Sequence, residues 1–489
     1  MTLSKTDFLS GQQCLRHLWW RRHEPDAVEL QPDKVLQDLF DQGNQVGALA
    51  RLQFPGGVLI ERSRGNFAAA VQQTATAIAA GATVLFEAAF HADGLNIATD
   101  VMLLRDDGWH LVEVKSSSER KDEHVPDAAV QAHVLAANAM PPVQIEIMHL
   151  NRDFQHPDVG QLFARTDVST EVPEAILDVA DEARRMLAAL DEPVPPEVKI
   201  GAHCLGPRKC VFHDRCWPHD ERHISTLYNV GPKKTIAYMA SGVNTIDDLP
   251  PGAKLPDVAR RQLRALATGT MVIEPTLARE LEVLDCETLG FLDFETIARA
   301  VPVWPAMAPW GQAAAQFSYH ESRGDGVYAH SEHLAEGPED ARPHVALKLV
   351  NATQRATKVV MYSSFEKTQI RSLAKAVPHL AGELHELEEK LVDLLPIVRN
   401  NVYHPAFRGS FSIKSVLPAL VPELSHNDLV IVNGMVASVE IARLLFVADR
   451  IPPAERARVR RDLLEYCKLD TWATVRLVEE LRKLAGSSA

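Results

Sequence analysis

Three charged residues on two neighbouring apolar segments could form a metal-dependent catalytic site. Asp100 ends the segment NIATD, and Glu113 and Lys115 alternate in the next segment, LVEVK. Alternate residues of a strand share one face, so Glu113 and Lys115 would point together towards Asp100 on the adjacent strand. Two carboxylates suit Mg²⁺, which activates a water and stabilises phosphoryl charge, and a lysine can hold the attacking water. The alternative is that these charges only decorate a solvent-facing sheet.

Two further side chains extend this first candidate site. Glu87 lies on the preceding apolar segment, TVLFEAAF, as a further acidic ligand, and Gln131 lies in the helical stretch AAVQAHVLAAN, from which it could orient the site. Turn signals at Asp93-Gly94 and Asp107-Gly108 separate the apolar segments and are typical of β-hairpins. The elements that position the site are therefore expected to be hairpin strands with a helix beside them.

The last third of the chain carries a second acidic constellation. Asp293 and Glu295 alternate in the strand-like segment GFLDFETIA, so their carboxylates face the same side. The segment KVVMY leads into a helix that presents Glu366, and Tyr466 and Asp470 stand at i and i+4 on a later helix. An acidic pair on a buried strand is costly unless it is paired or metal-bound. The pattern predicts a second metal site assembled from separate elements.

Four cysteines form a third set of candidate ligands. Cys14 stands near the amino terminus, and three more follow a proline-rich stretch at 192–199, at positions Cys204, Cys210 and Cys216. Four thiolates suit either a [4Fe–4S] cluster or tetrahedral zinc, and a coincidental arrangement is the alternative. Cys286 and Cys467 lie in apolar surroundings and are expected to be ordinary buried residues.

Two segments between these sets are expected to be helical. Residues 382–398 carry leucines at helical spacing, which predicts one amphipathic helix with an acidic solvated face, and they include Asp393 as a support candidate for the second site. Residues 221–280 contain short helical patterns around Gly231 and Gly242 and predict a small helical connector. This segment resembles half a helix-hairpin-helix, whose glycine turns approach a phosphate, and a plain helical linker is the favoured alternative.

Length and composition bound the class of protein. A chain of 489 residues suggests two or three domains, and 46% hydrophobic with 24% charged residues is typical of soluble globular proteins. No apolar run approaches 18 residues and the amino terminus lacks a secretory signal, so we expect a cytoplasmic protein without membrane association. The net charge of −14 argues against an overall basic nucleic-acid-binding protein but leaves local arginine clusters, as in CLRHLWWRRH and RARVRR.

The first acidic set and the four cysteines resemble the RecB-type group of PD-(D/E)XK nucleases. The residues that show this resemblance are Asp100, then Glu113-Val-Lys115, then Gln131 on a helix. Some members of this group hold an iron–sulfur cluster with one cysteine near the amino terminus and three after the nuclease core, an arrangement that Cys14 and the later three cysteines resemble. The resemblance implies metal-dependent cleavage of DNA phosphodiesters by a domain that the cluster closes.

The second acidic set resembles the DEDD exonucleases of the DnaQ-like, RNase H-fold group. These proteins have D-x-E on the first strand, an acid in a loop-to-helix motif and Y-x3-D on a late helix. The resemblance implies that two divalent ions bind to Asp293, Glu295, Glu366 and Asp470, and that Tyr466 orients the attacking water. A degenerate RNase H fold kept for packing or binding is the alternative.

These patterns together predict an α/β protein with two nuclease domains and a small helical connector. The expected parts are a RecB-type PD-(D/E)XK domain at 1–220, a helix-hairpin-helix-like connector at 221–280 and an RNase H-like DEDD domain at 281–489. The predicted activity is Mg²⁺- or Mn²⁺-dependent hydrolysis of DNA, trimming ends or single strands in repair, recombination or defence. The alternatives are a nucleic-acid-binding or scaffold protein with one or both centres inactive, and an RNA exonuclease. No protein partner is predicted.

Overall fold

The chain forms two compact units. The computed structural model describes residues 1–62, 65–157, 159–324, 326–424, 431 and 433–487. The first unit comprises Met1–Trp217 with Arg299–Gly311, and the second comprises Pro218–Ala298 with Gln312–Ala489. Each unit combines helices with β-sheet, which confirms the expected α/β class. Within the described residues, every helix is too short or too polar to span a bilayer.

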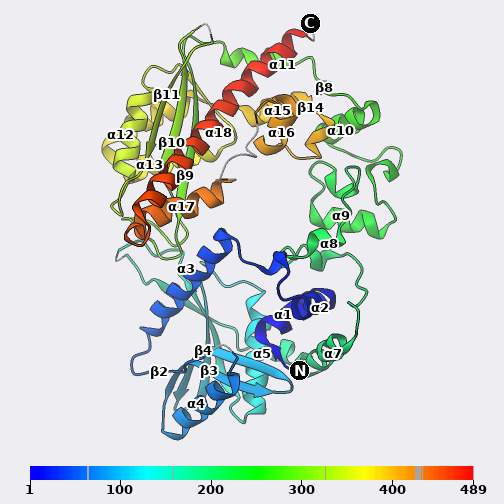
Figure 1. The fold of residues 1–489 in the computed structure, drawn as a ribbon, viewed down its shortest axis with the longest axis vertical. Helices are drawn as coiled ribbons and strands as arrows, with labels where there is room; N and C mark the ends of the chain where they lie inside the picture. Colours follow the sequence, from blue (N-terminus) through cyan, green and yellow to red (C-terminus); the bar gives the residue numbers. More distant parts are fainter. Residues whose placement is uncertain (63–64, 158, 325, 425–430, 432, 488–489) are drawn as a thin grey trace. The chain divides into compact units, whose positions relative to one another are not determined.

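A mixed sheet with the strand order β2-β3-β4-β5-β6-β7 forms the centre of the first unit (Figure 1). β3 and β4 form one antiparallel hairpin and β4 and β5 the next, whereas β5 and β6 are parallel. The hairpins turn at the predicted places, where Gly94 adopts φ 75° and Gly108 adopts φ 134°. The strands are β1 Leu3–Ser4, which pairs with β4, β2 Val58–Leu59, β3 Val84–Ala92, β4 Leu95–Arg105, β5 Gly108–Lys115, β6 Pro142–Leu150 and β7 Phe163–Asp167.

Helices cover this sheet and bring the amino terminus to it. α5 packs on β3, β4 and β6 through a face rich in Ala and Val, and α1 packs on β4 and α5. α1 begins where the Ser4 side chain accepts a hydrogen bond from the Asp7 amide in a capping box. The helices are α1 Lys5–Gln13, α2 Leu15–His23, α3 Lys34–Arg51, α4 Phe67–Ala79, α5 His124–Ala137, α6 Val172–Ile176, α7 Val179–Asp191 and α8 His213–Cys216.

A segment from far along the chain completes the first unit. Residues 299–311 follow a strand of the second unit, yet Ala300, Val301 and Trp310 pack in one apolar cluster with Val46 of α3 and Leu150 of β6. The Arg299 guanidinium also donates hydrogen bonds of 2.8 and 2.9 Å to the two carboxylate oxygens of Asp38 on α3. The first unit is therefore not contained within residues 1–220.

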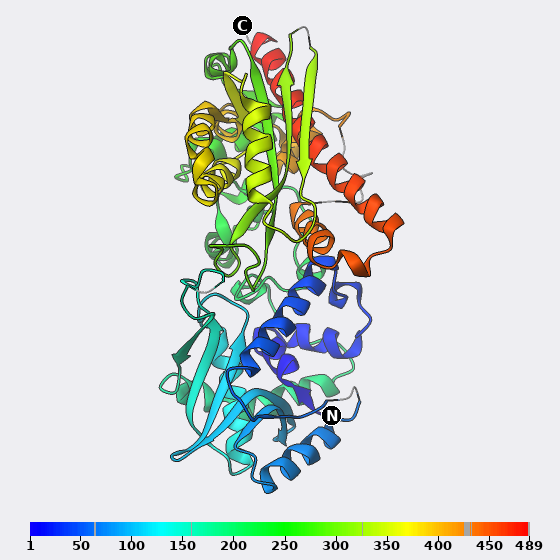
Figure 2. The ribbon, with the colours of Figure 1, turned by 90° about the vertical axis from the view of Figure 1, so that its left-hand side faces the viewer.

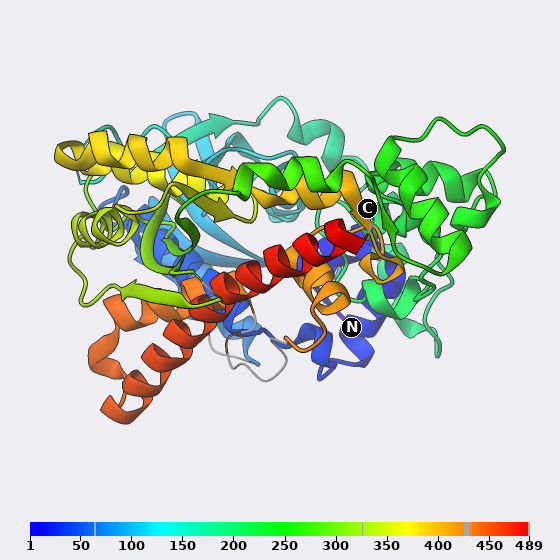
Figure 3. The same cartoon turned by 90° about the horizontal axis from the view of Figure 1, so that it is seen from above.

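The second unit is built on a sheet with the strand order β11-β10-β9-β12-β13. β9 is antiparallel to β10 and parallel to β12, so it is an interior strand of the sheet. Figures 2 and 3 show helices α12–α14 on one face of this sheet and α18 on the other, where α17 also packs on β9. The strands are β9 Leu289–Ala298, β10 Gln312–Ser322, β11 Tyr328–Leu334, β12 Lys358–Met361 and β13 Leu391–Asp393.

The helices of the second unit include the residues expected to form a connector. α9 Gly231–Ala240, α10 Asp257–Thr268 and α11 Leu277–Leu281 precede the sheet, and β8 Val272–Ile273 pairs with β14 Val402–Tyr403. The later helices are α12 Arg342–Thr353, α13 Phe365–Ala376, α14 Ala381–Lys390, α15 Leu394–Asn401, α16 Ile413–Leu420, α17 Gly434–Phe446 and α18 Pro453–Ser487.

The prediction of one helix over residues 382–398 is wrong. Leu391–Asp393 form β13, which pairs in parallel with β12 and separates α14 from α15. Pro396 has no amide hydrogen, so it cannot donate to the carbonyl of Val392 as a continuous helix would require. The Asp393 side chain instead accepts hydrogen bonds from the amides of Leu395, at the start of α15, and Ser363.

We predict that Arg299→Ala destabilises the first unit by about 1–2 kcal/mol, because both carboxylate oxygens of half-buried Asp38 lose their hydrogen bonds from Arg299 Nη1. Hydrogen exchange of the α3 amides should accelerate while exchange in β9 and β10 stays unchanged. Arg371→Ala is the matched control, since it removes an exposed ion pair with Glu388 in the second unit and should leave α3 unaffected. Unchanged α3 exchange in the Arg299 variant would contradict the role given to the segment.

Candidate active sites and a four-cysteine site

Three carboxylates line up across neighbouring strands of the first unit. The β4–β5 register pairs Val101 with Val112 and thus places Asp100 beside Glu113. The β3–β4 register pairs Phe86 with Val101 and Ala88 with Thr99, which places Glu87 on the other side of Asp100. The predicted acidic residues therefore form one row from β3 to β5.

Glu113 is the most enclosed member of this row and has partners on both oxygens. Its side chain is 2% exposed, and Lys115 Nζ lies 2.7 Å from Oε1. Gln131 Nε2 on α5 donates to Oε2 at 2.7 Å. Asp100 Oδ2 accepts a hydrogen bond of 2.7 Å from the Val114 amide. The structure thus brings together Asp100, Glu113, Lys115 and Gln131, as the sequence predicts.

Two residues that the sequence analysis missed belong to this site. Lys5 Nζ, from the first turn of α1, lies 2.8 Å from Glu113 Oε1 and 2.9 Å from Asp127 Oδ1. Asp127 is buried on α5 and also binds Lys115. Asp127 precedes Gln131 by one helical turn, which was an available signal. Lys5 stands 108 positions before Glu113, and no local pattern connects them.

The charges of this site are strongly coupled. Burial and the neighbouring Glu113 raise the pKa of Asp100 to about 7. Burial opposes ionisation of Glu113 as well, but Lys115 and Lys5 outweigh it and hold the pKa of that carboxyl well below its ordinary value. The site thus keeps Glu113 ionised beside two ammonium groups, whereas the pKa of Asp100, about 7, lies near neutral pH.

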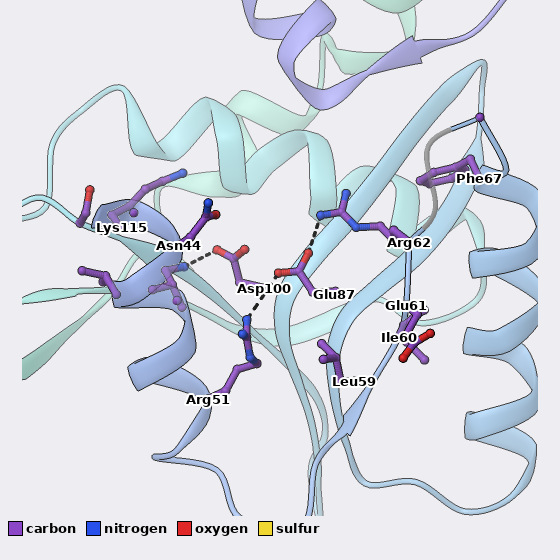
Figure 4. Close-up of a pocket in the computed structure, with 16 residues that line it drawn as sticks. Asn44, Arg51, Leu59, Ile60, Glu61, Arg62, Phe67, Glu87, Asp100 and Lys115 are labelled. Carbon is purple, nitrogen blue, oxygen red and sulfur yellow. Dashed lines mark hydrogen bonds and ion pairs between the residues drawn. The ribbon is translucent and has the colours of Figure 1, made fainter. Parts of the chain in front are cut away.

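A cavity of about 1180 Å³ opens beside Asp100 and Lys115 (Figure 4). Glu87 faces this cavity with a left-handed backbone of φ 56°, which is a strained conformation for glutamate. Arg62 Nη2 lies 2.6 Å from one Glu87 oxygen and Arg51 Nη1 lies 3.8 Å from the other. The cavity therefore presents two guanidinium groups next to the row of carboxylates, and such groups suit phosphate.

The second unit holds a compact acidic group on β9 and α18. One carboxylate oxygen from each of Asp293, Glu295 and Asp470 lies within 4.8 Å of the others, and among the described residues these three form the set with metal-ligand spacing. Asp293 and Glu295 face the same side of β9, as predicted, and α18 packs on β9 and β10. The structure thus brings together three of the four predicted acidic ligands.

The remaining predicted residues adjoin this group. Glu366 stands in the first turn of α13, 4% exposed, and its Oε2 atom is buried without a hydrogen-bond partner among the described residues. Burial raises the pKa of Glu366 well above its ordinary value, and the neighbouring Asp293 adds to the rise. Tyr466 lies one turn before Asp470 on α18, and its pKa is raised by burial and by that carboxylate. The strand, the turn at Ser363 and the two helices therefore converge on Asp293.

Cys467 is a neighbour of Asp293 that the sequence analysis assigned to the core. The thiol is buried, and its sulfur lies 3.5 Å from Asp293 Oδ2, to which it donates. Its surroundings are acidic rather than apolar, because Asp293 and Glu295 contribute to raising its pKa after burial. Cys286 also differs from expectation, since it is only half-buried.

The donor set of the second site fits a divalent cation. Burial and Asp470 raise the pKa of Asp293 to about 8, and burial with Asp293 and Asp470 raises the pKa of Glu295. Gly434 opens α17 at this site, where a Cβ atom would lie only 3.4 Å from Glu295 Oε2. Hard oxygen ligands with excess negative charge are what Mg²⁺ or Mn²⁺ requires.

The four predicted cysteine ligands converge in the first unit. Cys14 links α1 to α2, Cys204 ends a short 3-10 helix and Cys216 ends α8. The Cys210 amide donates to the Cys204 carbonyl at 2.9 Å, which folds the loop back on itself. Burial raises the pKa of Cys210 to about 11, and the other three thiols add to that shift. Cys14 and Cys210 each feel the charge of neighbouring thiols of this set, so the four side chains lie in one region, and four thiolates are the ligand type of an iron–sulfur cluster or of zinc.

The arginines next to Cys14 have partners within the protein. Arg21 and Arg22 bind the buried Asp7 carboxylate on α1, at 3.2 and 2.8 Å. Arg16 Nε donates to the Pro196 carbonyl at 2.9 Å, and its guanidinium lies over the ring of Trp20. These side chains therefore fasten α2 to its surroundings.

Comparisons with known proteins cover only part of the chain. Residues 290–412 match a family model described as a domain of unknown function, DUF2779. That range includes Asp293, Glu295 and Glu366 but ends before Tyr466 and Asp470. No curated protein matches the chain. A solved structure, "Crystal structure of SSO0001", shares 11% identity and a TM-score of 0.21 with this chain, over 44% of this chain and 85% of its own.

We predict that without divalent cations the second unit loses stability as pH rises from 3.8 towards about 8, the ordinary and the raised pKa of Asp293. In this window the folded protein retains a proton that the unfolded chain has released, so a rise in pH favours unfolding. Thermal unfolding in EDTA across the window measures the effect. Asp293→Asn should flatten the dependence and Mg²⁺ should reduce it, whereas the exposed control Glu465→Gln should keep it. An equally steep dependence in the Asp293 variant would refute this assignment.

Proposed function

We propose that this chain is a metal-dependent nuclease with two catalytic centres that hydrolyses phosphodiester bonds in DNA. The observation that carries the proposal is the convergence of buried and half-buried carboxylates from separate elements at two places, the strand pair β4–β5 and the strand β9. Clustered carboxylates with little solvent access cost folding free energy unless protons, ammonium groups or cations compensate for their charge, so such clusters are candidate cation sites. The proposed domains are a RecB-type PD-(D/E)XK fold in the first unit and an RNase H-like DEDD fold in the second.

In the first centre, the proposal gives distinct tasks to the residues. Asp100 and Glu113 would hold Mg²⁺ or Mn²⁺, with Glu87 as a further acidic group. A bound cation activates water and offsets charge on the phosphoryl oxygen. Lys115 is placed to orient the attacking water, and Gln131 holds Glu113 in position through Oε2. Arg51 and Arg62 line the adjoining cavity, where they can bind substrate phosphates.

In the second centre, Asp293, Glu295, Glu366 and Asp470 would be the cation ligands. The buried Oε2 atom of Glu366, which lacks a partner among the described residues, supports this role. Tyr466 is protonated at neutral pH like an ordinary tyrosine, and burial and Asp470 raise its pKa further, so its hydroxyl would be a donor to the attacking water or to phosphate. The carboxylates would bind the cations, and Tyr466 would orient the attacking water.

The cysteines support a structural cofactor rather than a catalytic one. Cys14 comes from the amino terminus and the other three ligands come from 204–216, so a cluster bound to all four would close the first unit upon itself. We infer an iron–sulfur cluster in this site. Zinc accepts the same four thiolates, but it lacks the visible absorbance that an iron–sulfur cluster has.

We predict that Asp100→Asn and Asp293→Asn each remove one cleavage activity, and that the double variant loses about 100-fold or more in total rate. End-labelled single-stranded DNA, double-stranded DNA and RNA with Mg²⁺ or Mn²⁺ provide the assay. Asp106→Asn and Glu465→Gln, exposed residues outside the two sites, are the controls and should leave the rates unchanged. Cleavage that survives in the double variant would refute the two centres, and cleavage of RNA alone would favour an RNA exonuclease.

We also predict that protein purified without oxygen is brown, with absorbance at about 400 nm and four cysteine ligands per cluster. Cys14→Ser should remove the colour and lower the thermal midpoint, because the ends of the first unit are no longer joined. Cys286→Ser is the control and should keep both. A colourless protein that contains stoichiometric zinc would contradict the cluster.

A further inference from the structure

Lys5 is a basic residue of the first centre that the family resemblance does not supply. Its ammonium group bridges Glu113 Oε1 at 2.8 Å and Asp127 Oδ1 at 2.9 Å. Lys115 bridges the same two carboxylates from its own strand. Two lysines from different elements therefore share two acids, with Asp100 as the nearest further carboxylate.

The position of Lys5 is fixed by the elements around it. Leu3 and Ser4 pair with Leu95 and Asn96 of β4, the strand that carries Asp100. Ser4 then caps α1, so Lys5 stands at a defined place in the first turn. Because strand pairing and the cap both precede the lysine directly, its side chain starts from a rigid backbone rather than from a loose terminus.

The bonds of Lys5 occupy the space that a cation would need. A carboxylate oxygen has two lone pairs, and both lysines donate to the same oxygen, Glu113 Oε1. Gln131 takes one lone pair of Oε2. A cation that binds to Glu113 must therefore displace a lysine from Oε1 or share Oε2 with Gln131.

A second, smaller cavity lies next to Lys5 and could receive its side chain. A cavity of about 380 Å³ adjoins the centre and is lined by Lys5, Thr6, Arg62, Asn96 and Asp100, among others. Lys115 instead lines the larger cavity, and Asp100 lines both. Glu87 also lines this cavity and pairs with Arg62 at 2.6 Å, so Lys5, once released from Glu113, would bring to the cavity an ammonium group that can bind a phosphate group.

We propose that Lys5 is a positioning residue that holds Glu113 and Asp127 in the absence of a cation and yields Glu113 when the cation binds. Its ammonium group then faces the smaller cavity, where it contacts a phosphate of the nucleic acid next to the scissile one. This inference rests on the proposed nuclease function. Within that function, Lys5 is the residue that couples cation entry to substrate binding.

Binding of Mn²⁺ to the full chain tests the exchange directly. Asp293→Asn with Asp470→Asn serves as the parent, so that the second centre does not contribute, and free Mn²⁺ is followed by electron paramagnetic resonance. Lys5→Met removes a competing positive charge, so Mn²⁺ should bind about tenfold more tightly, while DNA cleavage by the first centre falls about tenfold or more. Lys5→Arg retains the charge and should restore the Mn²⁺ affinity of the parent and part of the cleavage.

The exposed control Lys121→Met should match the parent in both measurements. A purely structural role predicts that Mn²⁺ affinity and cleavage fall together in Lys5→Met, and this result overturns the inference. An unchanged Mn²⁺ affinity in Lys5→Met overturns it as well. So does a parent that binds no Mn²⁺. A parent that binds Mn²⁺ but cleaves nothing refutes the nuclease proposal, while tighter Mn²⁺ binding in Lys5→Met would still support the exchange. Circular dichroism of each variant shows whether it is folded, and if Lys5→Met is not folded, Lys5→Gln replaces it with the same expected results.

Discussion

Buried negative charge on interior strands is the constraint on which both units depend. Asp293 and Glu295 lie within an otherwise apolar strand, with Phe291, Leu292 and Phe294 around them, and Asp470 adds a third carboxylate. Such a group costs folding free energy unless protons, ammonium groups or cations compensate for it. The apolar packing of the sheet must therefore hold these residues in place against their mutual repulsion.

The two sites compensate for this repulsion by different means. In the first, Lys5 and Lys115 offset the charges of Glu113 and Asp127, and the pKa of Glu113 stays low. The second has no lysine in hydrogen-bond contact among the described partners of Asp293, so the pKa of that carboxyl rises and the Cys467 thiol donates to it. The first site is thus held by two lysines in direct contact with its carboxylates, whereas in the second the charge of Lys414 opposes the shift of Glu295, whose pKa nevertheless stays well above its ordinary value because of burial and the neighbouring carboxylates.

Local periodicity explains which parts of the sites the sequence could predict. The hairpin turns determine the β3–β4–β5 register, and that register places Asp100 beside Glu113. The i, i+4 spacing places Tyr466 and Asp470 on one face of a helix. Lys5 could not be predicted, because its position depends on the pairing of β1 with β4, which lies about 90 residues further along the chain. The packing of residues 299–311 in the first unit was missed for the same reason, since nothing local distinguishes that segment from an ordinary loop between β9 and β10. Pro396 was a local signal that one helix does not continue from α14 into α15, but the helical spacing of the leucines favoured a single helix.

The geometry of α1 connects two features of the first unit that the sequence presents as separate. Lys5 stands in the first turn of this nine-residue helix and Cys14 follows its last residue. Gly11 lets the helix approach α7 closely, since a Cβ atom there would lie 2.5 Å from Met186 Sδ. Asp7 joins the same helix to Arg21 and Arg22 of α2. Because its cap, its packing on α7 and its ion pairs with α2 hold this helix along its length, one element places both Lys5 among the carboxylates and Cys14 at the cysteine site.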